Sequence, residues 1–296
     1  MKRIVVFANK WWEADPLCWV VLHDQAHPSC FTDYSIIKYP TFRTQLTPGA
    51  PRPPDPPAMP RLTFKCAGTV VEIWCIQELM NAAENSSSSL EKARVLTPVL
   101  SAGATLVVAF GTAGSKPSVS ANGSVIIGRR VFIHDPTAAG ASGKWIPPVP
   151  DTVLDSPLSQ SALRSFTDAA RNAAEARLLR PPIAPADPPL VLVGNGFVSV
   201  GVVNVTNYDD YIWADQDAVS AFNKTSSNGQ VGSIETTHGI VRSLTTSPFM
   251  YVSGITDADG LFDFQVTPRT YNQNVTAAHN AAVALAWFLP DLIGVL

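Results

Sequence analysis

Two short, largely apolar runs in the C-terminal part of the sequence each lead to an acidic residue, and this pattern limits the possible folds more than any other. Val231 to Ile234 is followed by Glu235, and Phe249 to Ile255 is followed two residues later by Asp257. Apolar runs of this length are typical of strands buried in a parallel sheet. Because ligands of open α/β sheets bind outside the carboxyl ends of the strands, the two carboxylates are predicted to face one site.

The rest of the chain is expected to alternate strands with helices. This alternation predicts one three-layer α/β/α domain over residues 1–296, with a central mixed, largely parallel sheet. The expected strands are Ile4 to Phe7, Leu62 to Cys66, Thr105 to Phe110, at least one within Ser124 to Ile133, Leu190 to Val193 and Val198 to Val205. The expected helices are Thr69 to Glu84, Leu90 to Leu100, Pro157 to Leu179, Asp215 to Phe222 and the terminal run Ala281 to Leu296.

A proline-rich segment interrupts this alternation at about residues 39–60. Proline lacks the backbone donor and fixes φ, so the densest part, residues 47–60, is excluded from helices and inner strands. It is interpreted as a stiff, exposed surface insert, and a ligand for a proline-reading domain is the alternative.

Charge and cysteine content exclude several functions. A net charge of −3 gives no electrostatic footprint for nucleic acid or an anionic membrane. The four cysteines form no Cys-x-x-Cys pair, which favours buried free thiols over a metal or redox site, and no cofactor is expected. The last apolar run contains Pro290 and Asp291 and is too short to span a bilayer, so a core helix and a cytoplasmic protein are predicted.

The two acid-bearing strands resemble the carboxy-terminal signature of the nucleoside phosphorylase and nucleosidase superfamily. In that family a Met-Glu pair binds the ribose hydroxyls, and a Ser-Asp pair supplies the acid that protonates the purine. The corresponding pairs here are Ile234-Glu235 and Thr256-Asp257. The resemblance implies that Glu235 and Ile234 bind substrate and that Asp257 is the catalytic acid. Read without the family, these acids suit a helix N-terminus and a turn, and Asp259 is a second candidate for the acid.

Two earlier segments extend the resemblance in the same order. Val-Val-Ala-Phe-Gly-Thr-Ala-Gly at 107–114 is similar to the family's strand and following Gly-Ser-Ala-Gly turn, which places Gly111 and Thr112 at the substrate. Val-Leu-Val-Gly-Asn-Gly-Phe at 191–197 resembles the strand and aromatic that hold the base. This implies that Phe197 stacks on the base and that Asn195 contacts it, and a core phenylalanine is the plain alternative.

The start of the chain resembles the family's first strand and an acid-bearing loop, which makes Glu13 the candidate to orient a water molecule, with Asp15 as its competitor. Phosphorylases of the family place an arginine just before the glycine at 111, where this chain has Ala109 and Phe110. Phosphate without arginine is poorly held, so water is favoured as the nucleophile.

The resemblance is nearest to methylthioadenosine/S-adenosylhomocysteine nucleosidases and implies a nucleoside as the small-molecule partner and a homo-oligomer, dimer or larger. The implied activity is hydrolysis of a purine nucleoside or 5′-modified adenosine. Two alternatives stay open. One is a phosphorylase that uses Arg129, Arg130 or Arg242, and the other is a non-catalytic nucleoside-binding relative.

Overall fold

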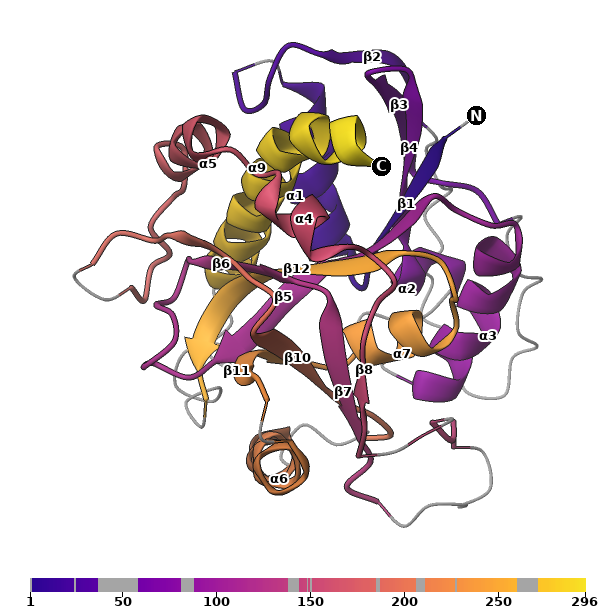
Figure 1. Ribbon diagram of the computed structural model, residues 1–296, viewed down its shortest axis with the longest axis vertical. Helices are drawn as coiled ribbons and strands as arrows, with labels where there is room; N and C mark the ends of the chain where they lie inside the picture. The colour runs from indigo at the N-terminus through magenta and orange to yellow at the C-terminus, as the bar shows by residue number, and fades with distance from the viewer. Residues whose placement is uncertain are drawn as a thin grey trace.

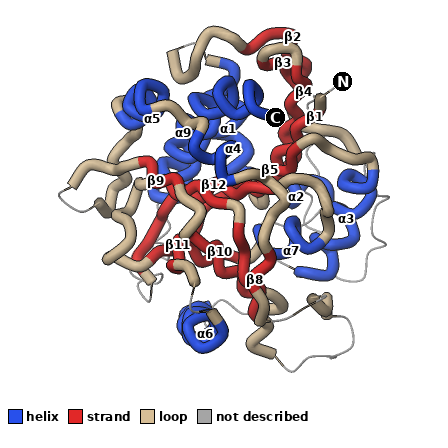
Figure 2. The backbone as a smooth tube through the Cα atoms, viewed as in Figure 1, coloured by secondary structure: helices blue, strands red, loops and turns tan. Residues whose placement is uncertain are grey.

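The computed structural model of this chain is one mixed sheet with helices on both faces (Figures 1 and 2). It describes residues 2–23, 25–36, 58–80, 88–137, 144–147, 149, 151–184, 187–205, 211–226, 228–259 and 271–296. The proline-rich insert predicted at about 39–60 lies outside these residues except for its last three positions.

Twelve strands make up the described sheet. They are β1 (Arg3–Ala8), β2 (Phe31–Ile36), β3 (Leu62–Cys66), β4 (Thr69–Cys75), β5 (Leu106–Ser115), β6 (Val125–Gly128), β7 (Arg130–His134), β8 (Val153–Leu154), β9 (Val191–Val193), β10 (Phe197–Val202), β11 (Gln230–Glu235) and β12 (Phe249–Ala258). Their order is β2-β3-β4-β1-β5-β11-β10-β7-β8, and β12 additionally pairs with β5 and β6, while β6 pairs with β9. The pairs β4–β1–β5–β12 and β7–β10–β11 are parallel, and antiparallel pairs lie mainly toward the edges.

Helices cover both faces of this sheet, so the predicted three-layer α/β/α architecture is confirmed. One face carries α1 (Trp11–Leu22), α9 (Tyr271–Val295), α4 (Gln160–Arg164) and α5 (Asp168–Glu175), and the other carries α2 (Ile76–Leu79), α3 (Ser89–Ser101) and α7 (His238–Ser243). The helix α6 (Tyr211–Thr225) packs on β7 and β10 from the side opposite α7, since Phe132 joins the cluster under α6 whereas Val131 and Ile133 join the cluster under α7. Successive side chains of a strand point to opposite faces. In β1, accordingly, Ile4 and Val6 join the core under α1 and α9, while Val5 and Phe7 join the core under α2, α3 and α7.

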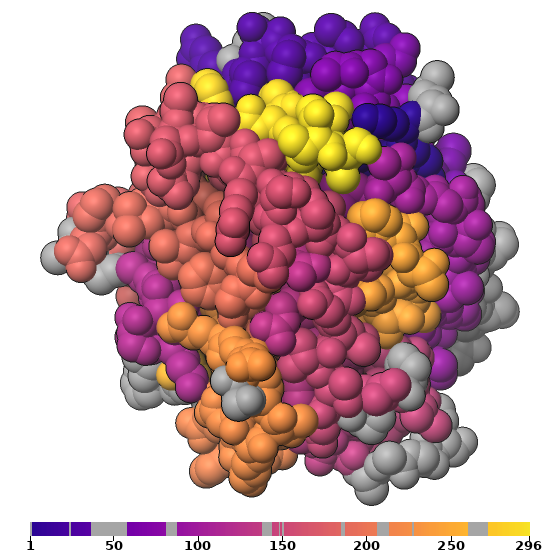
Figure 3. Space-filling model, viewed as in Figure 1, coloured from indigo at the N-terminus to yellow at the C-terminus, as the bar shows by residue number. Residues whose placement is uncertain are grey.

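The terminal helix α9 is a core element of this architecture. It packs on β12, β5 and α1, and in the space-filling view its end (yellow) lies beside residues from the start of the chain (indigo; Figure 3). By length and composition alone α9 could cross a membrane, but two thirds of that stretch is buried in the protein. Gly254 of β12 allows the close approach, since a Cβ at that position would clash with the carbonyl oxygen of Ala277.

One predicted helix is wrong. Thr69 to Cys75 forms strand β4 and only Ile76 to Leu79 is helical. The sequence Thr-Val-Val-Glu-Ile-Trp alternates buried and half-buried side chains, which suits a strand rich in β-branched residues. Ala67 and Gly68 adopt positive φ values of 46° and 78° and turn the chain tightly from β3 into β4.

Two further boundaries differ from the expectation. The predicted helix over Pro157 to Leu179 is divided into α4 and α5, because the hydroxyls of Ser159 and Thr167 each cap a new helix start. The predicted turn at Gly111 to Gly114 belongs instead to β5, which stays paired with β12 as far as Ser115. The end of β5 therefore lies in the sheet between β11 and β12, and this positions the candidate site.

Candidate active site

The end of β5 brings the two acid-bearing strands together. Gly114 is the pairing partner of Ile234 in β11 and also of Asp257 in β12. Glu235, the next residue after Ile234, and Asp257 thus leave the sheet on either side of the same short stretch of β5. β12 runs parallel to β5 and β11 runs antiparallel to it, so the acids meet because both strands pair with Gly114 near the carboxyl end of β5.

Glu13 reaches the same stretch from the first turn of α1. Its Oε1 accepts hydrogen bonds from the backbone N–H and the hydroxyl of Thr112, both at 2.7 Å, and its Oε2 accepts from the backbone N–H of Lys10 at 2.9 Å. Gly111 leaves room for the carboxylate, since a Cβ there would lie 3.1 Å from Oε1. Burial raises the pKa of Glu13, and the hydrogen bonds from Thr112 and Lys10 oppose that rise. Asp15 instead forms an ion pair with Arg61.

Asp257 is almost fully buried, with 3% of its surface exposed. Burial raises the pKa of its carboxyl group to about 6, with a further contribution from the charge of Asp259, while a hydrogen bond from the Thr256 hydroxyl opposes the rise. That bond measures 2.5 Å to Oδ1, and Oδ2 would lie 3.0 Å from a Cβ on Gly114. A carboxyl group with this pKa can hold a proton close to neutral pH and donate it.

Glu235 ends β11 and caps the start of α7. Its Oε2 accepts the backbone N–H groups of Thr237 and His238, the latter at 2.7 Å, and its Oε1 lies 3.4 Å from the hydroxyl of Ser199. A carboxylate offers about four acceptor positions, so capacity for a ligand remains on Oε1. His238 is buried, its Nδ1 lies 3.0 Å from the Ser199 hydroxyl, and burial lowers its pKa, so its ring is neutral.

Two residues that the sequence interpretation missed connect these acids electrostatically. Burial raises the pKa of Asp215 in α6 well above its ordinary value, and the charges of Asp257, Asp259 and Glu235 add to that rise. Burial lowers the pKa of Lys92 in α3, and the charges of Glu235 and Glu13 both oppose this fall. The three candidate acids therefore act on shared neighbours, which indicates one site.

Only Lys92 had a signal in the sequence. It falls on the buried face of α3, four residues before Leu96 and seven before Val99, where a lysine is unexpected. The described residues contain no group of three or more His, Cys, Asp or Glu side chains placed to hold a metal ion.

The structure does not bring Phe197 and Asn195 to this site. Phe197 begins β10 beside Gln230, whereas Glu235 lies beside Gly201 at the other end of the same strand pair. Four residues along a strand span about 13 Å. Phe197 packs against the core under α2, α3 and α7. The side-chain carbonyl oxygen of Asn195 accepts a hydrogen bond from the guanidinium group of Arg129. Both residues thus lie at the end of the strands that is remote from Glu235. The two residues therefore lie apart from the acids with which they were predicted to form one site.

Ile234 lies in the sheet beside Gly114, and its side chain fills the apolar cluster under α6. Of the three arginines considered as phosphate ligands, two are engaged elsewhere and the third starts a strand away from the acids. Arg129 donates to the carbonyl oxygens of Ser156 and Leu158, Arg130 begins β7 at the edge opposite the acids, and Arg242 donates to the carbonyl oxygens of Asp155 and Thr245.

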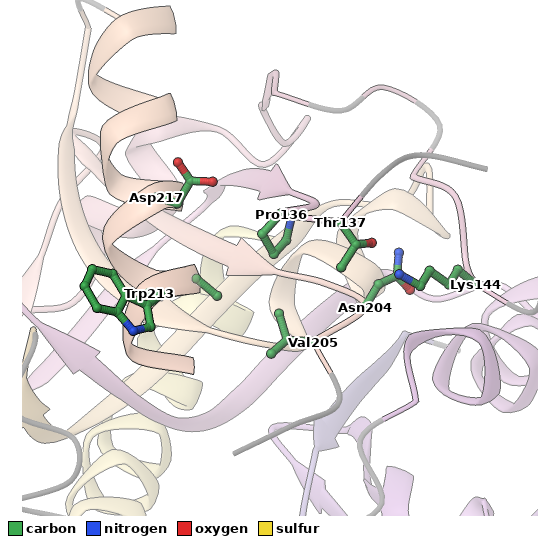
Figure 4. A pocket seen from close by; sticks show the side chains of 8 residues that line it. Pro136, Thr137, Lys144, Asn204, Val205, Trp213 and Asp217 are labelled. Atoms are coloured by element: carbon green, nitrogen blue, oxygen red, sulfur yellow. The ribbon is translucent and has the colours of Figure 1, made fainter. Parts of the chain in front are cut away.

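A separate hollow of about 480 Å³ lies beside α6, at the ends of β7 and β10. Trp213 and Asp217 of α6 line one side of it, and Lys144 and Asn204 line the other side (Figure 4). His134 anchors Asp217 at 3.0 Å from its Nε2 and binds Asp151 through Nδ1 at 2.7 Å. Successive helical residues are turned by about 100°. Asp215, two residues from both Trp213 and Asp217, therefore points away from this hollow and toward the acids.

Comparison with solved structures identifies the fold. The S-adenosylhomocysteine nucleosidase of Streptococcus pyogenes, solved with 5-methylthiotubericidin, is similar with a TM-score of 0.55 at 13% identity, over 98% of this chain and 96% of that one. The methylthioadenosine/S-adenosylhomocysteine nucleosidase of Helicobacter pylori, in a mutant form with 5′-methylthioadenosine in the active site, gives a TM-score of 0.56 at 13% identity over all of both chains. The futalosine hydrolase of the same organism gives 0.51 at 14% identity over all of both chains.

No protein-family model and no curated protein sequence matches this chain. The structural likeness at this low identity concerns the fold. The chain has the fold of the nucleoside phosphorylase and nucleosidase superfamily, as the sequence resemblance predicted.

Proposed function

We propose that this protein hydrolyses the N-glycosidic bond of a purine nucleoside or a 5′-modified adenosine. The observation that carries the proposal is the arrangement of Glu13, Glu235 and Asp257 around Gly111 to Gly114, on a fold shared with nucleosidases. The raised pKa of Asp257 supports its role as an acid, and the half-engaged carboxylate of Glu235 supports its role as an acceptor for the ribose hydroxyls.

In the proposed reaction, the bond between C1′ of the ribose and N9 of the purine breaks, and its electron pair moves to the purine. Asp257 donates its proton to N7 of the base, which neutralises the charge that develops there. Glu13 accepts a proton from water while the water oxygen forms the new bond to C1′. A positioned acid of this kind contributes about 10²–10⁴-fold to the rate. Glu235 accepts hydrogen bonds from the 2′- and 3′-hydroxyls.

Water rather than phosphate is the proposed nucleophile, because the arginines considered as phosphate-binding residues do not support phosphorolysis. Arg129 and Arg242 are held by backbone carbonyl groups, and Arg130 starts a strand at the other edge of the sheet. Near the acids lie Lys10 and Lys92, whose charges repel each other. Lysine holds phosphate without the paired donors of arginine.

The decisive measurement is release of free base from a panel of purine nucleosides and 5′-modified adenosines in phosphate-free buffer. We expect free base and a reducing sugar, unchanged in amount when phosphate is added. Strict dependence on phosphate, with a sugar 1-phosphate as product, would replace hydrolysis by phosphorolysis. Binding of nucleosides without any base release would leave a binding protein.

A further inference from the structure

A buried ammonium group lies directly behind the proposed ribose acceptor. Lys92 has no exposed surface, and its Nζ lies 3.1 Å from the carbonyl oxygen of Thr236, 3.2 Å from the Thr236 hydroxyl and 2.9 Å from the Thr237 hydroxyl. These three acceptors match the three donors of an ammonium group. Among the described residues Lys92 forms no ion pair, so its charge is solvated by the dipoles of this one turn.

The same turn holds Glu235 in place. Thr237 and His238 donate their backbone N–H groups to Oε2 of Glu235, so any movement of the Thr236–Thr237 turn moves these donors. The link from Lys92 in α3 to the carboxylate in β11 thus runs through two residues. A methionine or leucine would fill the same space without the cost of burying a charge, so packing alone does not account for an ammonium group here.

The surroundings of Lys92 contain charges of both signs. Burial and the positive charge of Lys10 lower the pKa of Lys92, the carboxylates of Glu235 and Glu13 raise it, and the resulting pKa is about 7. His238 also faces Lys92, and its ring is neutral. Because all three hydrogens of the ammonium group are used by the turn, Lys92 is a poor ligand for an incoming anion but a rigid support for Glu235.

We infer that Lys92 is a positioning residue for ribose recognition: by fixing the Thr236–Thr237 turn it keeps Oε1 of Glu235 directed at the 2′- and 3′-hydroxyls of the nucleoside. This inference rests on the proposed function and deepens it, because it assigns selectivity for ribonucleosides over sugars that lack these hydroxyls. Loss of the ammonium group weakens binding of the diol and leaves contacts to the base untouched.

The test compares adenosine with 2′,3′-dideoxyadenosine in the wild type and in Lys92→Met, with affinity measured by isothermal titration and KM by base release. Loss of one charge-assisted contact corresponds to about a tenfold weaker affinity. In Lys92→Met we expect the Kd and KM for adenosine to rise by about this factor, and the Kd for the dideoxy analogue to change less than twofold. In the wild type, affinity for adenosine should fall as the pH rises through about 7, where the ammonium group loses its proton. In Lys92→Met this dependence should disappear.

Thr237→Val is the second variant, since it removes one acceptor of Lys92 and keeps the shape of the side chain. Thr237→Val should also weaken the binding of adenosine, and it takes the place of Lys92→Met in the test if that variant proves unstable in thermal melting. Lys224→Met, at an exposed lysine at the end of α6, is the matched control and should change the affinity for neither ligand. Equal loss of both ligands, or no loss of adenosine affinity, overturns the inference. Binding without base release in the wild type overturns the hydrolytic function alone, because the titrations still test Lys92.

Discussion

Protonation of Asp257 should set the pH dependence of kcat. Its carboxyl pKa of about 6 lies above the ordinary value of an aspartate, so the proton needed by the leaving base is present below pH 6 and is lost above it. With the pKa of Asp257 unchanged by bound nucleoside, half of the molecules carry the proton at pH 6, against about 1% at pH 8, which predicts a fall in kcat of about fiftyfold over these two units. Titration of Lys92 does not contribute, because it acts on binding and saturating substrate removes its effect.

The assay measures kcat at saturating nucleoside from pH 6 to pH 8 in the wild type, in Asp257→Asn and in Asp259→Asn. Asparagine cannot donate a proton of this acidity, so Asp257→Asn should lower kcat at pH 6 by about 10²–10⁴-fold and flatten the profile. Asp259→Asn should keep the slope and move it to slightly lower pH, because the charge of Asp259 raises the pKa of Asp257. A flat wild-type profile, or a slope that disappears in Asp259→Asn instead, would refute the assignment of the acid.

Three further outcomes follow from the geometry. Glu13→Gln should lower kcat by about 10²-fold or more with little change in KM, because it removes the proton acceptor for water; an unchanged kcat in single-turnover base release would exclude Glu13. Glu235→Gln should raise KM for ribonucleosides by about tenfold, since a charged acceptor is lost, and titration with a dideoxynucleoside should show no loss. Gly254→Ala should lower the free energy of unfolding by about 3 kcal/mol or more through its clash with Ala277, measured by urea denaturation, whereas Gly196→Ala, with open space around it, should change it by less than about 0.5 kcal/mol.

The sequence was sufficient for the elements whose periodicity is local. The apolar runs before Glu235 and Asp257 form β11 and β12 as predicted, because runs of this kind are buried on both faces in a parallel sheet. The helix predicted at Thr69 to Glu84 is wrong because the local pattern there was ambiguous. Its apolar residues fit both periods, and the hairpin turn at Ala67 and Gly68 decided in favour of a strand.

The candidate site depended on pairings that no local pattern reveals. Phe197 follows an apolar run, as a base-stacking aromatic would, but Val191 to Val193 is β9 and Phe197 starts the next strand. Only the register of β10 against β11 shows that Phe197 and Glu235 lie at opposite ends of this strand pair. Lys92 was missed because its partners are separated from it by more than 140 residues, as the hydrogen bonds to Thr236 and Thr237 record.

The packing of α1 against α9 has a consequence for the synthesis of the protein. The buried side of α1, which ends at Leu22, is covered in the finished structure by a helix that begins at Tyr271. At a translation rate of about 5–20 residues per second, tens of seconds pass between the emergence of the two helices from the ribosome. During this interval the apolar face of α1 and the edge of β5 that later receives β12 have no partner from the same chain. We therefore expect nascent chains stalled before Tyr271 to bind chaperones that recognise apolar segments, and full-length chains to release them.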